Sequence, residues 1–112
     1  MKYLVLVQRQ HPFDYDKVLD PSARQAIDQV NDEMVAAGVR VFVGGLKSPN
    51  TATTLRLQTD GEVLVMDGPY LETKDYIDGL WVLECPNLDA ALEWGHKASR
   101  ACRASIEIRP FA

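Results

Sequence analysis

The division of this chain into elements is decided by the stretch Thr53-Thr54-Leu55-Arg56-Leu57-Gln58-Thr59-Asp60-Gly61-Glu62-Val63-Leu64-Val65-Met66. Its beginning and its end are rich in β-branched and aliphatic side chains, which is typical of strands. The Asp60-Gly61 pair between them is a strong hairpin signal, because a tight β-turn needs residues that accept positive φ. We therefore expect a β-hairpin in the middle of the chain.

The segments on either side of this hairpin follow one pattern. Residues 2–8 and 39–43 are short apolar runs typical of buried strands, and a helical pattern lies between them. Residues 76–85 and 105–109 are strands that enclose a second helical pattern. Without the hairpin, this order is the split βαβ arrangement of ferredoxin-like folds. The sequence therefore predicts one α+β domain over residues 1–112, a ferredoxin-like subunit with an additional central β-hairpin.

Both helices carry clear start signals. Asp20 can cap the first helix, Pro21 suits its first position, and Gly38 can end it. Asn87 can cap the second helix. Each helix has an apolar stripe at spacings of three and four, which predicts the face that it buries. The stripes are Ala23, Ile27, Val30, Met34 and Ala37 in the first helix, and Leu88, Ala91, Leu92, Gly95, Ala98 and Cys102 in the second.

Two helices can cover only one face of such a sheet. The other face must also be buried, and a second copy of the chain is the simplest cover. We therefore expect a homodimer, with isologous contacts between the two copies.

The bulk composition excludes several classes of protein. With 112 residues, 46% of them hydrophobic and 25% charged, the chain has ordinary globular composition. Its net charge of -4 argues against a nucleic-acid groove, which depends on clustered Lys and Arg. No apolar run approaches the ~20 residues of a membrane span, and no signal peptide is evident. Cys85 and Cys102 are too few for a disulfide scaffold, so we expect free thiols and a cytoplasmic protein.

The segment after the hairpin is the first candidate site. Asp67-Gly68-Pro69-Tyr70 consists largely of turn residues, and Glu72 and Lys74 follow closely. An aspartate at a strand end beside a lysine can be held ionised and act as a general base. A solvated turn with no further role is the alternative interpretation of the same residues.

Other candidates also carry two interpretations each. Gly44 and Gly45 can offer backbone N–H groups to an anion, or simply form a bulge or turn. Trp81 can pack in the core or form a pocket wall. His11 lies in a loop that can sit over a pocket, whereas His96 is expected at the surface. The two histidines lack the spacing of metal ligands, and glycine-rich nucleotide fingerprints are absent, so we expect no metal and no cofactor.

Several of these motifs together resemble a known family, the YCII-related proteins of the DGPF type. The string Asp67-Gly68-Pro69-Tyr70-Leu71-Glu72-Thr73-Lys74 is the most specific part, although Tyr70 stands where Phe is more usual. The resemblance covers essentially the whole chain. It implies a ferredoxin-like subunit that pairs as a dimeric α/β barrel, with a cleft between the sheet and the partner.

The resemblance implies less about activity. The YCII branch is thought to use a His–Asp pair, with the histidine at the start of the first helix. Asp67 matches the aspartate, but Ser22-Ala23-Arg24 stands at the helix start, and Lys74 or His11 would have to replace the histidine.

Two functions follow as expectations. The first is a small-molecule enzyme or binder with its pocket at the dimer barrel and Asp67 as acid/base or ligand anchor. In this function Lys74 and Glu72 are the charge partners of Asp67. Gly44 and Gly45 provide backbone N–H donors, and Tyr70 and Trp81 form the walls of the pocket. The second is a non-catalytic accessory or regulator that acts through protein contacts. It has a link to a sigma-factor system, which relatives of this type often neighbour.

Overall fold

The computed structural model describes residues 1–11 and 18–112. The elements follow in the order β1 (Lys2–Gln10), α2 (Pro21–Ala36), β2 (Arg40–Gly45), the 3-10 helix η1 (Pro49–Thr51), β3 (Thr53–Leu57), β4 (Val63–Asp67), β5 (Asp75–Glu84), α3 (Leu88–Cys102) and β6 (Ser105–Pro110). The expected helices, strands and central hairpin are therefore all present. Strand β1 continues to Gln10, beyond the strand expected at residues 2–8, and residues 12–17 lie outside the described part.

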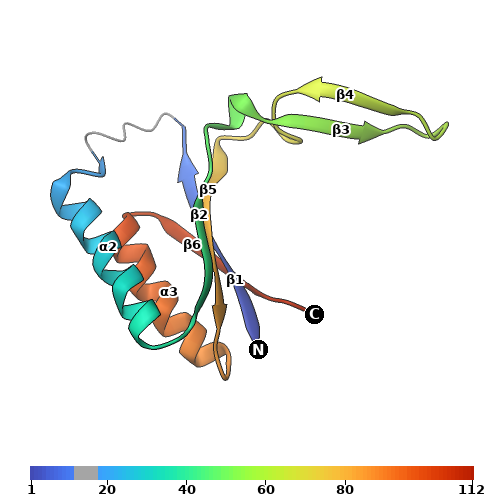
Figure 1. The fold of residues 1–112 in the computed structure, drawn as a ribbon. Coiled ribbons are helices and arrows are strands. Elements are labelled where there is room, and N and C mark those ends of the chain that lie inside the picture. The colour runs from blue at the N-terminus through green and yellow to red at the C-terminus, as the bar shows by residue number, and fades with distance from the viewer. Residues whose placement is uncertain (12–17) are drawn as a thin grey trace.

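The strands form two antiparallel sheets. The larger has the order β2-β5-β1-β6, and the smaller is the β3-β4 hairpin. Figure 1 shows α2 and α3 side by side on one face of the larger sheet. This arrangement is the ferredoxin-like α+β fold that the element order predicts. The described strands form open sheets and not a closed barrel.

The helix ends follow the capping chemistry of the sequence. The Asp20 side chain accepts a hydrogen bond from the Ala23 backbone N–H at 3.0 Å, and Asn87 caps α3 in the same way. Gly38 follows α2 with a φ of 71°, a conformation that costs glycine little. No helix among the described residues has the length and apolar character to span a membrane.

The core lies between the helices and one face of the sheet. Tyr3, Val5 and Val7 alternate along β1 toward the helices, and Trp81 and Leu83 do the same on β5. They pack against buried side chains of both helices, namely Val30, Met34, Ala91, Ala98, Ala101 and Cys102.

The helix stripes are only partly buried. Leu88 and Leu92, expected to face inward, are 48% and 40% exposed, and Ala37 is exposed as well. The small side chains of Ala91 and Ala98 face the core instead. The leucines lie at the margin of this narrow contact, so the apolar periodicity overestimates the buried width of α3.

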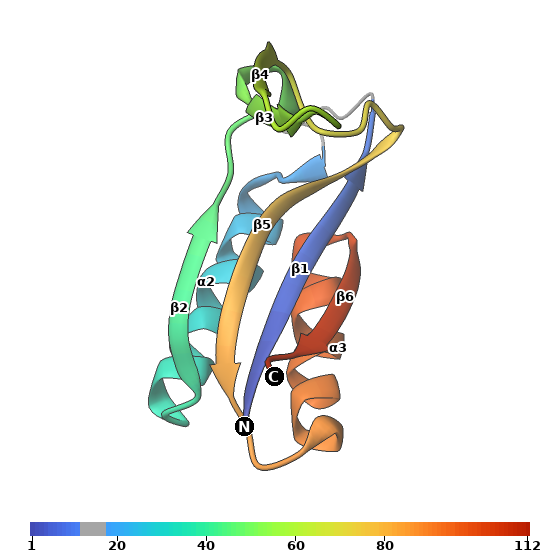
Figure 2. The same cartoon turned by 90° about the vertical axis from the view of Figure 1, so that its right-hand side faces the viewer.

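The second face of the sheet is open in the single chain. Figure 2 looks onto this face, with both helices behind the four strands. Leu4 pairs with Val82 and Leu6 with Leu80 on this side, and Phe42, opposite Val82, is 57% exposed. The β3-β4 hairpin projects from one end of the sheet, away from the helices (Figure 1).

Candidate functional site

A large cleft lies where the hairpin leaves the sheet. Its volume is about 1300 Å³, and four segments line it: the end of β1, the loop 46–52, the loop 67–73 and the start of β5. These segments are distant in sequence. They meet because β1 pairs with β5, and because the hairpin is inserted in the chain between β2 and β5.

An aromatic pair forms one side of the cleft. The His11 ring stacks on the Tyr76 ring with 4.3 Å between centroids and 23° between the planes. The His11 backbone N–H donates to the Lys74 carbonyl at 2.9 Å, which continues the β1-β5 ladder beyond Gln10. Both the ring contact and the backbone bond fix the position of the imidazole, which is otherwise exposed.

Backbone hydrogen bonds hold the two loops beside the hairpin. The Gly68 N–H donates to the Ala52 carbonyl at 2.7 Å, and Thr54 Oγ1 donates to the Gly68 carbonyl at 2.8 Å. Gly68 has a φ of 105°, which a residue with a side chain rarely adopts. In the other loop, Thr51 Oγ1 donates to the Ser48 carbonyl at 2.7 Å. The loops are therefore ordered by their own backbone and hydroxyl groups.

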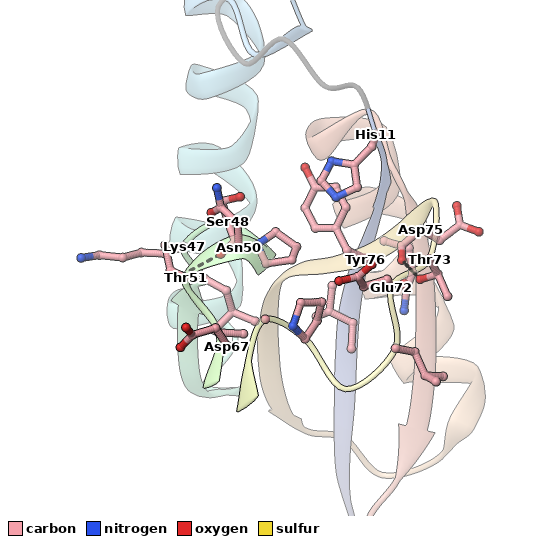
Figure 3. Close-up of a pocket in the computed structure, with 18 residues that line it drawn as sticks. His11, Lys47, Ser48, Asn50, Thr51, Asp67, Glu72, Thr73, Asp75 and Tyr76 are labelled. Atoms are coloured by element: carbon pink, nitrogen blue, oxygen red, sulfur yellow. Dashed lines mark hydrogen bonds between the residues drawn. The ribbon is translucent and has the colours of Figure 1, made fainter. Parts of the chain in front are cut away.

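Asp67 lies at the end of β4 and lines the cleft opposite the aromatic pair. Figure 3 shows it on the far side from His11 and Tyr76. Its side chain is exposed, and none of the described residues donates a hydrogen bond or forms an ion pair with its carboxylate. The turn that follows Asp67 does not need this carboxylate, which is therefore free to contact a ligand.

The structure brings only some of the predicted site residues together. Asp67, Glu72 and His11 line the cleft. Lys74 does not line it and contributes the carbonyl that accepts from His11. Tyr70 also lies outside, with the Arg56 guanidinium 4.5 Å from its ring centre.

The glycine pair and the tryptophan have structural positions. Gly44 and Gly45 belong to β2, where a Cβ on the facing Gly79 would lie 3.0 Å from the Gly44 carbonyl oxygen. Close approach of the two strands thus accounts for glycine at position 79, whereas a Cβ on Gly44 would lie 3.2 Å from the Phe42 ring and a Cβ on Gly45 would meet nothing within 4 Å. Trp81 is 3% exposed in the core, and its Nε1 donates to Asn31 Oδ1 at 2.9 Å, so it forms no wall of this cleft.

Sequence reasoning missed the partners of His11. Tyr76 was assigned to a strand without a site role, and Gln8, Ser48 and Asn50 were not singled out. At the start of β5, Tyr76 and Ile77 follow Asp75 without alternation, so the sequence gives no signal for the side on which Tyr76 lies. No local pattern could have placed it against a histidine that precedes it by so many residues.

The cleft is rich in carboxylates. Asp67, Glu72 and Asp75 line it, whereas Lys47 is the single ammonium group among its described lining residues. Figure 3 shows the Lys47 side chain directed away from the cleft, and the carboxylates of Asp67 and Asp75 lie toward its outer sides as well. Among the described residues, no group of three or more His, Cys, Asp or Glu is arranged to hold a metal ion. The side chains present can accept hydrogen bonds, exchange protons and stack on a flat ligand.

Comparison with known proteins gives a family and one relative. The model of the YCII-related domain matches residues 1–112. An uncharacterized protein of Rhizobium meliloti is 35% identical over 100 residues, which cover 88% of this chain and 80% of the relative.

Proposed function

This chain belongs to the YCII-related domain family, and we propose that it binds a small molecule in the cleft at the base of the hairpin. Asp67 is the ligand anchor or acid/base group in this proposal. The observation that supports it is that an aromatic pair and a carboxylate with no hydrogen-bond or ion-pair partner among the described residues line opposite sides of one cleft. A concave site with a few polar groups is the usual form of a small-molecule site.

The charges of the cleft favour one class of ligand. Three carboxylates and one lysine line the cleft, so an anionic ligand such as a phosphate ester would meet net repulsion. A neutral or cationic ligand with hydrogen-bond donors fits better. The flat face of the His11–Tyr76 pair favours a planar or aromatic group.

The other predicted residues take different parts in this proposal. Glu72 stays a polar contact because it lines the cleft. Lys74 acts through its backbone carbonyl, which positions His11. Tyr70, Gly44, Gly45 and Trp81 are left out because they do not line the cleft.

We further propose that the protein is a homodimer, in keeping with the sequence expectation. The open face of the sheet carries Leu4, Leu80 and Val82 at its centre, and neither α2 nor α3 lies over it (Figure 2). Burial of apolar surface is the main favourable term in association, so a face of this kind gains by pairing.

A ligand screen with matched variants tests the binding proposal. Thermal unfolding is measured with a panel of neutral, cationic and phosphorylated compounds. A neutral or cationic ligand at a hundredfold its Kd is expected to stabilise the protein by about 2.7 kcal/mol. Asp67→Asn and His11→Ala are expected to fold but to lose at least about tenfold in affinity, or roughly 1.4 kcal/mol.

Asp32→Asn is the control, because Asp32 is an exposed carboxylate on α2. The helices lie on the face of the sheet opposite to the side on which the hairpin projects. It should bind as the wild type does. Unchanged affinity in both Asp67→Asn and His11→Ala would contradict the assignment of the cleft.

A non-catalytic accessory role is the second candidate. The observation that favours it is the set of apolar side chains exposed on the hairpin, which suits protein contacts. The same screen separates the two candidates, because a protein that acts only through protein contacts gains no stability from any compound of the panel.

A further inference from the structure

The hairpin exposes an apolar face. We call residues 53–67, which comprise β3, β4 and their turn, the arm. Leu55, Leu57, Val63 and Val65 point to one side of it, because Leu55 pairs with Val65 and Leu57 with Val63. Their exposed fractions are 66%, 72%, 50% and 71%. We call these four side chains the apolar arm face.

The opposite side of the arm is more polar, and the chain itself covers part of it. Thr54 and Arg56 of β3 lie there and are half-buried, opposite Met66 and Leu64 of β4, which are 43% and 51% exposed. Thr54 Oγ1 donates to the Gly68 carbonyl, and Arg56 Nη2 donates to the Tyr70 carbonyl at 3.0 Å with its guanidinium over the Tyr70 ring. The arm thus directs the polar side chains of β3 toward its own chain and leaves the apolar arm face outward, the reverse of what a monomer in water favours.

The size of the molecule indicates how much surface a partner would cover. The chain exposes 7719 Å², whereas a folded monomer of 12.5 kDa exposes about 6200 Å². Its radius of gyration is 16.1 Å, against about 13 Å for a compact domain of this length. The excess of about 1500 Å² lies within the roughly 1000–2500 Å² that each subunit covers in an obligate homodimer.

The same chain offers a surface that fits the arm. Leu4, Leu80, Val82 and Phe42 form an apolar strip on the open face of the sheet, and the arm projects on the side of that face (Figure 1). A two-stranded hairpin alone is marginally stable in water, so the arm needs a cover. Two copies related by a twofold axis can each insert an arm against the sheet of the other, which makes a closed isologous contact.

We propose that the apolar arm face docks on the open sheet face of a second copy, and that the partner thereby completes the cleft. Asp67 connects the two parts, because it pairs with Thr53 and its side chain points to the same side of the arm as Leu55 and Val65. A partner that covers the apolar arm face also covers the Asp67 side of the cleft. This last step rests on the proposed function of the cleft, whereas the docking of the arm does not.

Two adjacent substitutions test the docking. Val65→Asp places a charge on the apolar arm face, and Leu64→Asp places the same charge on the opposite side of the same strand, where it faces Arg56. Both place the same residue in the same strand, so they compare the two sides of the arm directly. In light scattering at micromolar concentration we expect dimers for the wild type and Leu64→Asp, and a folded monomer for Val65→Asp.

Near-ultraviolet circular dichroism of the buried Trp81 verifies that each variant is folded. A monomeric wild type, which would point to a different partner, would overturn the proposal. So would a dimeric Val65→Asp, or dissociation by Leu64→Asp as complete as that by Val65→Asp.

Thiol labelling tests whether the partner covers Asp67, and it remains informative if Val65→Asp folds poorly. Cys85 and Cys102 are buried, and burial raises the pKa of both thiols, so they react slowly. In Asp67→Cys the new thiol should react at least about tenfold more slowly in the dimer than after dilution to monomer or in the Val65→Asp background. Equal rates would overturn the shared cleft. Neither measurement uses a ligand, so a failure here is distinct from a failure of the ligand screen.

Discussion

Arg9 shows how one side chain connects the sheet to a helix end. It lies on β1 with 5% of its surface exposed, in a position where β1 shifts register against β5. Its Nε donates to Asp78 Oδ2 at 2.7 Å, and Nη1 donates to the Cys102 carbonyl at 2.9 Å. The guanidinium therefore donates hydrogen bonds both to a carbonyl at the end of α3 and to a carboxylate on β5. It lies next to the part of β1 that lines the cleft.

At this scale we predict a large loss of stability for Arg9→Met. The substitution breaks the ion pair with Asp78, whose side chain is only 14% exposed, and breaking a buried ion pair costs about 3–5 kcal/mol. Urea unfolding measures the loss. Lys97→Met is the control, because the exposed Lys97–Glu33 pair at 3.2 Å should contribute less than about 1 kcal/mol. Equal losses in the two variants would contradict this difference between buried and exposed pairs.

At the scale of elements, the start of α2 illustrates how local chemistry fixes a helix end. Asp20 accepts from the Ala23 backbone N–H at 3.0 Å and from Ser22 Oγ at 2.7 Å, and Arg103 approaches it from the end of α3. The hydrogen bond from Ala23 is the main cause that lowers the pKa of Asp20 from 3.8 to about 2, and the bond from Ser22 adds to it. The ionised carboxylate is thus the form that the helix prefers.

Because the pKa of Asp20 is lowered in the folded state, the free energy of unfolding depends on pH in the acid range. A carboxyl whose pKa is lower in the folded state stabilises the protein above its unfolded pKa, and this contribution is lost as the pH falls from about 4 toward 2. We expect Asp20→Asn to make the decline of unfolding free energy over this range less steep. Urea titrations at several pH values measure the slope. An unaltered slope in Asp20→Asn would contradict the role of this cap.

At the scale of the whole molecule, the shape of the chain couples folding to assembly. The molecule measures 49 × 37 × 17 Å, with helices on one face of the sheet and the arm extending from the other side (Figure 1). A thin molecule of this kind buries little of its second sheet face by itself. Under the proposed pairing, the two open faces and the two apolar arm faces form a second core between the subunits.

A dimer of this kind has a melting temperature that depends on protein concentration, because dissociation accompanies unfolding. With about 2.1 cal/mol/K of unfolding entropy per residue, the wild-type Tm should rise by about 3 °C for each tenfold increase in concentration. Scanning calorimetry over a hundredfold range measures this rise. Val65→Asp should melt at a lower temperature that does not vary with concentration. A constant wild-type Tm would contradict the coupling.

Local patterns in the sequence determined most of the fold. The Asp60-Gly61 turn, the caps at Asp20 and Asn87 and the apolar runs of the strands act over a few residues, so periodicity and turn chemistry could identify them. The order of these elements then allowed few sheet topologies, since short connections place consecutive elements next to one another. Leu88 and Leu92 are the exceptions, because periodicity gives an apolar stripe but not the width of the contact that buries it.

The site depended on contacts between distant segments. The sequence pointed to Asp67, Glu72 and His11, but only the pairing of β1 with β5 brings His11 onto Tyr76, and only packing assigns Trp81 to the core. The alternation in the hairpin likewise shows that it has an apolar side, and tertiary structure alone decides that this side faces outward. Local preferences are set by neighbours along the chain, whereas a cleft and an exposed face are set by which surfaces remain uncovered once all the elements have packed.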